Sequence, residues 1–322
     1  MKHQFNWLIP RSWNEVPTAD LEVISKLTLE REIIATADER LADANFKTKV
    51  LMQCAGLVAD GMTDEEDGTT TYHFRTREFW PWKRQHVSAT ADQVRAMCQS
   101  YLGWLDEPYG RLRAPYDIVK IKGRRFKGPS NKMTSLTYMQ YQTAQNYLTR
   151  YWQVQDMLRH LMENGGSREA VTNQVEQLED IASRFLATLF NPTHYDTEYR
   201  GDKKVRTILP NDFDPRQVDQ FAPLFRSKQG ERMLPVVMQF FLSVMRYFAQ
   251  IYPDLFVTRE DASGKRPDML MLEVESMSAI MKYQGFRDYQ TIYDSEAVHI
   301  LKVLDNMAKE SKELKRIQSQ NK

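Results

Sequence analysis

The sequence predicts a mainly α-helical fold with a bundle-like architecture and a small β element inserted near residues 70–127. Apolar residues recur every three to four positions through most of the 322 residues, which is the period of an amphipathic helix. Only 70–77 and 116–126 alternate β-branched or aromatic residues with polar ones, as strands do. Helices therefore dominate, and the strands form a minor element among them.

The N-terminal region is expected to hold two helices. Thr18 can cap the first helix, and the second spans roughly 30–58. The acidic segment 60–70 then ends the helical pattern. We expect it to be a solvated loop, because it lacks the ligand spacing of a calcium loop. The first helix should turn three residues inward: Leu21, Ile24 and Leu27.

The strand at 116–126 should present alternate residues to opposite sides of the β element. One side carries Ile118, Lys120 and Lys122, and the other carries Val119 and Ile121. An amphipathic helix at 91–105 separates this strand from the one at 70–77. Three tryptophans are expected to pack beneath the strands rather than to form a platform for nucleic-acid bases: Trp80, Trp82 and Trp104.

Two facing apolar stripes predict an antiparallel helical hairpin after Pro129. The first helix covers 135–163, the sequence "NGGS" turns the chain, and Ser167 caps the second helix. The first stripe consists of Tyr141, Ala144, Leu148, Trp152, Leu158 and Leu161. The second consists of Val171, Val175, Leu178, Ala182, Phe185 and Leu189.

The polar segment 191–215 is expected to be irregular. Within it, 196–214 is the candidate linker between an N-terminal region, 1–195, and a C-terminal helical region, 215–322. A single compact domain is the alternative arrangement. The C-terminal helices are expected at 216–226, 231–252, 268–283 and 295–317.

The longest apolar run, 234–252, is long enough to raise the question of a membrane span. Its polar residues recur at steps of four, three and four, so they form one stripe on a helix: Gln239, Ser243, Arg246 and Gln250. An arginine inside a membrane span would cost about 3 kcal/mol. The sequence therefore predicts a buried helix with one polar face, and no membrane partner.

Charge and cysteine content exclude two classes of protein. The chain has 44 Lys and Arg against 43 Asp and Glu, a net charge of +1, which argues against attraction of nucleic acid to the whole surface. Two cysteines are too few for a disulfide-stabilised fold. Cys54 and Cys98 are expected to be buried free thiols in a reducing compartment.

No sequence signature indicates catalysis, a cofactor or a metal. The chain has no Gly-x-Gly, no Cys-x-x-Cys and no two histidines at metal-ligand spacing. Three acids in 266–276 resemble half of a metal-dependent nuclease motif, but the expected lysine is missing: Asp268, Glu273 and Glu275. We therefore predict a protein that is not an enzyme and uses no cofactor or metal. A hydrolase with a site dispersed along the chain is the catalytic alternative.

A basic strip lies between residues 120 and 132, and no carboxylate occurs between Asp117 and Asp156. Gly128 and Pro129 indicate that the chain leaves a strand there. Three interpretations stay open: a solvated surface, a contact with an acidic protein partner, or a grip on nucleic acid. The cations are Lys120, Lys122, Arg124, Arg125, Lys127 and Lys132.

The C-terminal segment 295–322 is expected to form a helix capped by Ser295. Its apolar stripe should pack on the body: Ala297, Ile300, Leu301, Leu304, Met307 and Ala308. Beyond Ala308, cations outnumber acids and only two large apolar residues remain, Leu314 and Ile317. We expect this end to project, and Leu314 and Ile317 to be free to dock on a partner.

The segment 126–152 resembles an uncharacterised family of proteins from phages and prophages of Bacteroides-type bacteria. The matching pattern begins with Phe-x-Gly-Pro at Phe126, Gly128 and Pro129. It continues with Leu136, Thr137, Tyr138, Gln140 and Tyr141, and then with Tyr147, Leu148, Tyr151 and Trp152. The N-terminal "NWLIPRSWNEV" and the C-terminal segment 280–316 extend the resemblance over most of the chain.

The resemblance implies a structural or assembly protein from a tail or virion gene cluster, and it assigns no catalytic residue. Expected partners are other virion proteins, acting in the bacterial cytoplasm during assembly or on the virion itself. Nucleic acid is the alternative partner, through the 120–132 strip. Neither the copy number nor the oligomeric state follows from the sequence.

Overall fold

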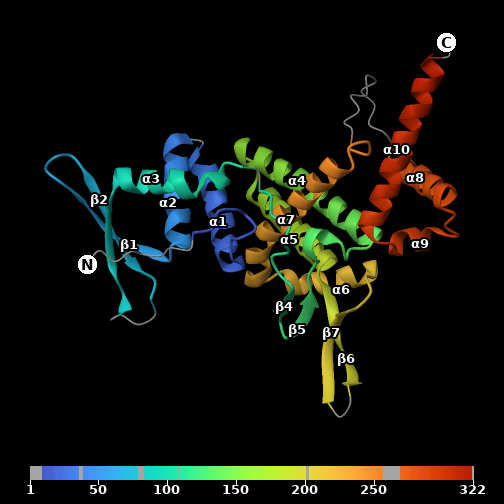
Figure 1. Ribbon diagram of the computed structural model, residues 1–322, viewed down its shortest axis with the longest axis horizontal. Coiled ribbons are helices and arrows are strands. Elements are labelled where there is room, and N and C mark those ends of the chain that lie inside the picture. Colours follow the sequence, from blue (N-terminus) through green and yellow to red (C-terminus); the bar gives the residue numbers. More distant parts are fainter. Residues whose placement is uncertain are drawn as a thin grey trace. The chain divides into compact units, whose positions relative to one another are not determined.

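The structure is a computed structural model that describes residues 9–35, 39–78, 83–107, 109–200, 203–256 and 269–320. Helices account for 62% of the chain and strands for 16%, with two small antiparallel sheets. The mainly α-helical class with minor β elements is therefore confirmed. The chain divides into two compact units, Met1–Arg111 and Leu112–Lys322 (Figure 1).

The first unit combines helices with a sheet of order β1-β2-β3. The helices are α1 (Thr18–Ala35), α2 (Glu39–Cys54) and α3 (Ala91–Tyr101), followed by the 3-10 turn η2 (Gly103–Leu105). The strands are β1 (Leu57–Asp64), β2 (Thr70–Thr76) and β3 (His86–Thr90). On α1, Leu21 and Ile24 are buried as expected, whereas Leu27 is half-buried.

Strand β1 corrects two expectations, because its residues were assigned to the end of a helix and to a loop. It pairs with β2 from Leu57 opposite Thr76 to Asp64 opposite Thr70, with a bulge between Ala59 and Gly61. The pairing satisfies the backbone amides and carbonyls. The acidic side chains stay exposed, so they do not oppose strand formation. Strand β3 was not predicted either.

A capping box begins α3 one residue after β3 ends. The Thr90 hydroxyl accepts from the Gln93 amide, and the Gln93 side chain accepts from the Thr90 amide. The helix ends at Tyr101 rather than at 105. Trp104 is buried and meets Trp13 edge-on at a centroid distance of 4.6 Å. Trp80 and Trp82 lie outside the described residues.

The second unit has a helical core with a sheet of order β4-β5-β6-β7 against it. Its helices are α4 (Tyr138–Glu163), α5 (Arg168–Leu189), α6 (Pro215–Phe225), α7 (Lys228–Ile251), α8 (Met269–Gln284), α9 (Tyr289–Asp294) and α10 (Ala297–Gln320), with the 3-10 turn η3 (Asn131–Met133). Its strands are β4 (Ile118–Ile121), β5 (Arg124–Lys127), β6 (Asn191–Arg200) and β7 (Lys203–Pro210).

The stretch 116–126 was expected to be one strand, but it folds into the β4–β5 hairpin. Lys122 and Gly123 form its two-residue turn, with φ of 46° and 86°. Left-handed backbone at both positions matches the twist of the flanking strands. Gly123 adopts this conformation without steric cost, because it has no side chain. The alternation of Ile118 and Lys120 outward with Val119 and Ile121 inward is confirmed, whereas Lys122 belongs to the turn.

The segment 191–215 is not irregular, and 196–214 is not simply a linker. It forms most of the β6–β7 hairpin, paired from Thr193 opposite Pro210 to Arg200 opposite Lys203. β6 also continues the sheet by pairing with β5 at Pro192 and Asn191. The two compact units instead divide between 111 and 112. The strands of this hairpin carry polar residues on both faces. Their sequence therefore lacks the alternation that would predict strands, and the hairpin is recognised only from its backbone pairing.

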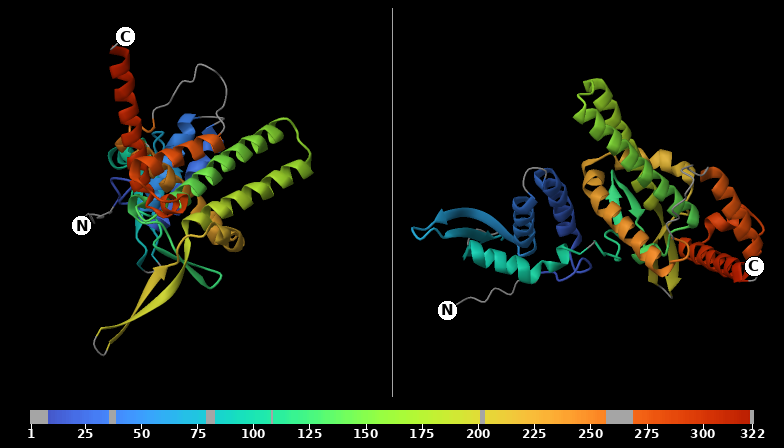
Figure 2. Two further views of the ribbon diagram at one scale, coloured as in Figure 1. Left: turned by 90° about the vertical axis from the view of Figure 1, so that its right-hand side faces the viewer. Right: turned by 90° about the horizontal axis from the view of Figure 1, so that it is seen from above.

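Helices α4 and α5 lie side by side as the predicted antiparallel pair and extend away from the core of their unit (Figure 2). Ser167 caps α5 as expected, and its hydroxyl accepts from the Ala170 amide. The α4 stripe is buried only near the core, at Tyr141, Ala144 and Leu148. Trp152 is 40% exposed, because the distal halves of the two helices cover only one another.

Helix α7 is long and apolar enough to cross a membrane by length and composition. In this structure it runs through the core, with its aromatic and β-branched residues buried: Val236, Val237, Phe240, Phe241, Val244 and Phe248. Of the predicted polar stripe, Arg246 and Gln250 are exposed, whereas Ser243 is buried and donates to the Gln239 carbonyl over 2.9 Å.

Ser295 does not cap the last helix. It ends α9, and its hydroxyl donates to the Thr291 carbonyl over 2.7 Å. α10 begins at Ala297, beside a β-bridge between Thr137 and Glu296 that ties it to the start of α4. Ala297, Ile300 and Leu301 are buried as expected, and Leu304, Met307 and Ala308 are half-buried.

Candidate binding surfaces

The β4–β5 hairpin places three cations of the basic strip on one exposed side of the sheet. Lys120 lies directly opposite Arg125 in the register, and Lys127 follows two residues along β5. On the other side of the same strands, Phe126 is fully buried and its ring lies 5.6 Å from Phe221. This packing fixes the hairpin, so Lys120, Arg125 and Lys127 form a firmly supported surface, here called the basic sheet face.

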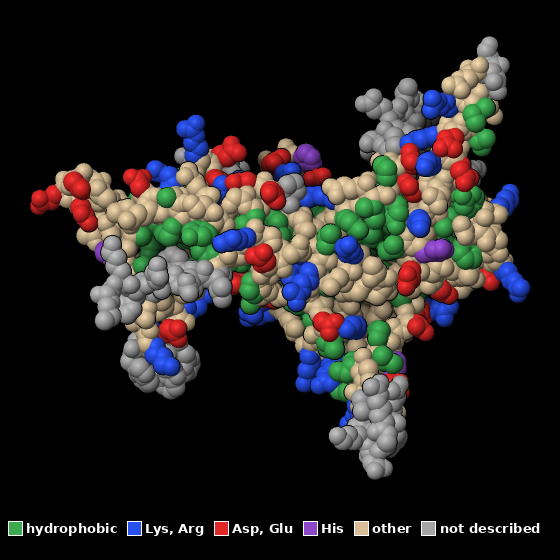
Figure 3. Space-filling model, viewed as in Figure 1, with side chains coloured by type: hydrophobic (Ala, Val, Ile, Leu, Met, Phe, Trp, Pro, Cys, Tyr) green, Lys and Arg blue, Asp and Glu red, His purple; other side chains and the backbone are tan. Residues whose placement is uncertain are grey.

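The three cations of the basic sheet face have different neighbours. The Arg125 guanidinium donates to the Tyr195 hydroxyl and lies 5.5 Å from the centroid of that ring. Lys127 forms an ion pair with Asp117. Lys120 is exposed and has no ion-pair partner among the described residues. Figure 3 shows Lys and Arg side chains gathered at this hairpin. The face therefore retains positive charge that its own unit does not neutralise.

The other three cations of the 120–132 strip contact residues away from the basic sheet face. Lys122 approaches the Pro223 carbonyl at 3.5 Å, and Arg124 lies 5.6 Å from the centroid of Phe221, so both are held beside α6. Lys132 lies 4.9 Å from the centroid of Tyr247 on α7. Lys132 and Met133 both have φ of 54°, an uncommon conformation for residues with side chains. The six cations of the sequence strip therefore do not form one surface.

The end of α10 is exposed from Lys309 to Gln320, as expected. Leu314 and Ile317 are 59% and 54% exposed. The last described contacts with other elements are the Lys312–Asp254 ion pair of 2.7 Å and the hydrogen bond of 2.6 Å from Tyr283 to Glu310. Leu314 and Ile317 therefore lie where a partner can reach them.

An acidic surface lies at the end of the β1–β2 hairpin in the first unit, here called the acidic tip: Asp64, Glu65, Glu66 and Asp67. A turn gathers these residues, with hydrogen bonds from the Glu65 amide to the Thr69 carbonyl and from the Gly68 amide to the Glu65 carbonyl. The Thr69 amide, which donates to the Asp67 carboxylate, lowers the pKa of that group, so it stays ionised.

The sequence predicted the acidic tip only as a solvated loop. One signal could have identified it as a distinct surface: no Lys or Arg occurs between Lys49 and Arg75. Two of the carboxylates accept only from threonines of β2, Asp64 from Thr70 and Glu65 from Thr71. Red side chains mark the end of this hairpin in Figure 3.

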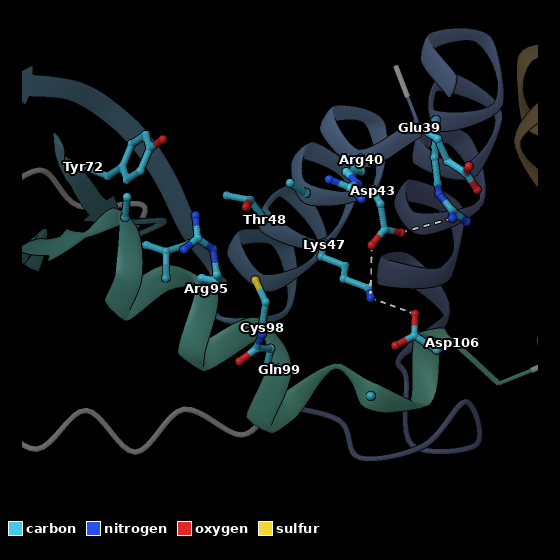
Figure 4. Close-up of a pocket in the computed structure, with 15 residues that line it drawn as sticks. Glu39, Arg40, Asp43, Lys47, Thr48, Tyr72, Arg95, Cys98, Gln99 and Asp106 are labelled. Carbon is cyan, nitrogen blue, oxygen red and sulfur yellow. Dashed lines mark ion pairs between the residues drawn. The ribbon is translucent and has the colours of Figure 1, made fainter. Parts of the chain in front are cut away.

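A trough of about 730 Å³ lies in the first unit between α2, α3 and β2 (Figure 4). Arg31, Asp43, Lys47 and Asp106 form a chain of ion pairs along one wall, with Lys47 3.2 Å from Asp43 and 2.7 Å from Asp106. Burial by itself lowers the pKa of the Lys47 ammonium. Hydrogen bonds to Asp106 and Asp43, with their charges, outweigh it and raise that pKa above its ordinary value.

The thiol that lines the trough is not activated as a nucleophile. Burial raises the pKa of the Cys98 thiol, which lines the trough, so the thiol stays protonated. Cys54 is half-buried rather than fully buried, and burial raises its thiol pKa to about 12. Within the described ranges, no group of three or more His, Cys, Asp or Glu residues could hold a metal ion. The side chains of Asp268, Glu273 and Glu275 lie outside the description.

Comparisons with known proteins identify no relative. The chain matches no protein-family model, no curated protein and no solved structure.

Proposed function

We propose that this chain is a non-enzymatic assembly protein of a phage or prophage, an adaptor or chaperone for tail or virion components. One observation carries the proposal: the second unit extends three elements beyond its core (Figure 2). These are the β6–β7 hairpin, the distal part of the α4–α5 pair and the end of α10. Extended elements of this kind add surface for partners without adding to the core.

The exposed side chains on these elements support docking. Met157 and Met162 on α4 are 47% and 67% exposed, and Tyr195 on β6 is 56% exposed. Methionine and tyrosine are adaptable contact residues in protein interfaces. The phage setting rests on the sequence resemblance alone, and with it the proposed location in the bacterial cytoplasm during assembly or on the virion. We propose other virion proteins as partners, and no cofactor or membrane.

Nucleic-acid binding is the second candidate function. The observation that favours it is Tyr195, an exposed ring on the same sheet as Lys120 and Arg125, since bases stack on aromatic side chains beside cations. Opposing it, Arg125 already lies against that ring, and Lys127 is paired with Asp117.

Affinity capture from cells in which the encoding phage is induced tests the proposal. The tagged protein should retain proteins of the same virion gene cluster, and truncation at residue 308 should weaken their recovery if the α10 end docks on them. The matched control replaces Leu41, 54% exposed on α2, with serine and should change nothing. Salt-sensitive recovery of DNA or RNA without virion proteins would instead establish the second candidate.

A further inference from the structure

Charge is divided unequally between the two units, although the whole chain is nearly neutral. Residues 1–111 hold 13 Lys and Arg against 17 Asp and Glu, a formal charge of −4. Residues 112–322 hold 31 against 26, a formal charge of +5. A run of four acids lies at the acidic tip of the first unit, and three cations lie on the basic sheet face of the second. Two copies therefore present each other with complementary surfaces.

The four carboxylates of the acidic tip have no cation beside them among the described residues of their own unit. Four consecutive carboxylates are exposed at the end of β1 and in the turn that follows it. Their described hydrogen bonds come from threonine hydroxyls and a backbone amide, and no cation joins them among the described residues. Neighbouring like charges repel one another, so an opposing cationic surface is favoured here.

The basic sheet face shows the same imbalance with the opposite sign. Lys120 and Arg125 are directly opposite one another on adjacent strands, a position in which like charges are unfavourable. Asp117 pairs with Lys127, and no carboxylate follows it in the chain until Asp156. Carboxylates placed between Lys120 and Arg125 would relieve this repulsion and form charge-assisted hydrogen bonds.

We propose that the acidic tip of one copy docks on the basic sheet face of a second copy. The inference names a partner for a surface of the proposed assembly protein and so rests on that function. The sizes are comparable, because the tip carries four carboxylates at the end of the β1–β2 hairpin and the face carries three cations on the β4–β5 hairpin. The two surfaces belong to different parts of the chain, so the contact is head-to-tail, and it propagates into an open chain or closes as a ring.

Charge reversal tests the contact. The tip variant carries Asp64→Lys, Glu65→Lys, Glu66→Lys and Asp67→Lys, and the face variant carries Lys120→Glu, Arg125→Glu and Lys127→Glu. Each variant alone should lose self-association, with an apparent Kd raised by about tenfold or more. An equimolar mixture should recover association, since each reversed surface then meets an opposite one. Sedimentation velocity across protein concentrations measures the mass.

The matched control for the face variant is Arg150→Glu, Arg159→Glu and Arg168→Glu, which makes the same charge change on exposed positions of the α4–α5 pair. It should associate like the wild type, and circular dichroism melts should show that every variant is folded. Added salt should weaken the wild-type contact, since the Debye length falls from about 10 Å at 0.1 M to about 3 Å at 1 M.

A wild-type protein that stays monomeric at every concentration overturns the proposal, and so does a mixture of the two variants that fails to associate. Docking of the tip on the face within one chain would appear as a concentration-independent monomer and counts against it too. Capture of virion proteins by a monomeric wild type would leave the proposed function standing while this inference fails. Self-association without capture of virion proteins would support this inference while the proposed function fails.

Discussion

Gly128 shows why the Phe-x-Gly-Pro pattern has a structural meaning. Its amide donates to the Asp117 carbonyl over 2.8 Å, and the backbone passes so close to Tyr116 that a side chain has no room. A Cβ atom there would lie 2.5 Å from the Tyr116 carbonyl oxygen and 2.9 Å from the Phe190 ring. Phe126 and Pro129 on either side are buried. The motif therefore holds the exit of the β4–β5 hairpin against the core.

Gly128→Ala should lower the free energy of unfolding by about 1–3 kcal/mol, the usual cost of overpacking. Gly103→Ala is the control, because an added methyl group meets no atom within 4 Å there. It should stay within about 0.5 kcal/mol of the wild type. Urea melts compare the free energies of unfolding of the two variants. Equal values would show that the backbone at residue 128 shifts to accommodate a methyl group without loss of stability.

An ion-pair network around Asp180 holds α5 to α6 and to the turn after it. The Asp180 carboxylate accepts from Arg184 at 2.7 Å and also pairs with Arg226, while Arg184 pairs with Asp219 as well. Partial burial by itself raises the pKa of Asp180. The hydrogen bonds and charges of the two arginines outweigh it and lower that pKa below its ordinary value. The ionised carboxylate is therefore favoured by folding.

Asp180→Asn should cost about 1 kcal/mol at pH 7, a modest loss because the pair is partly exposed. Since the pKa of Asp180 is lower in the folded than in the unfolded chain, its contribution is present above the unfolded pKa of about 3.9. It is lost as the pH falls further, through the folded pKa. The stability difference between variant and wild type should thus shrink below about pH 4. Urea melts at pH 7, 5 and 3.5 measure this difference. The same difference in unfolding free energy at all three pH values would contradict a lowered pKa of Asp180.

Among the elements, helices were predictable from the sequence and edge strands were not. Helices α4, α5 and α7 each carry a periodic apolar stripe, and the caps at Thr137 and Ser167 mark where two of them begin. β1 and β6–β7 present polar residues on both sides, so no alternation distinguishes them from loops. Their formation depends on a partner strand, a long-range property that local sequence patterns do not contain.

The site was predictable only in part, for the same reason. The sequence identified the cations of the 120–132 strip, but the turn at Lys122 and Gly123 divides them. Only the strand register brings Lys120 opposite Arg125. The register depends on backbone pairing, which local sequence patterns do not contain.

The two halves of α10 should differ in what they contribute to stability. Removing residues 309–322 loses one described ion pair and one described hydrogen bond at the surface, worth about 1 kcal/mol together. Ile300→Ala instead empties a fully buried position and should cost about 2–5 kcal/mol. Thermal melts compare them directly. A truncated protein less stable than Ile300→Ala would show that the exposed half of the helix supports the fold.

Helix α7 should behave as a core helix rather than a membrane span. Because its apolar residues pack against α4 and α5, the expressed protein should be found in the supernatant without detergent. Alkaline washing of the membrane fraction is the decisive step. Protein that remains in the membrane after the wash would mean that α7 leaves the core to enter the bilayer.

At the scale of the whole molecule, opposite charges are placed on separate units while the sum stays near zero. A net charge of +1 gives little long-range attraction to nucleic acid. A unit of −4 and a unit of +5 on one chain instead favour contact between copies. Under the proposals above, the protein therefore acts by docking charged surfaces, with its own second copy as one partner.

The most direct measurement is zero-length carboxyl-to-amine cross-linking of an equimolar mixture of ¹⁴N-labelled and ¹⁵N-labelled protein, read by mass spectrometry. Docking of the tip on the face of a second copy predicts cross-links between peptides of the acidic tip and peptides that contain Lys120 or Lys127, with both isotopes joined in one product. It also predicts that these mixed products disappear in high salt. Cross-links confined to single-isotope pairs, or none between the tip and the face, would show that the two surfaces do not dock between copies.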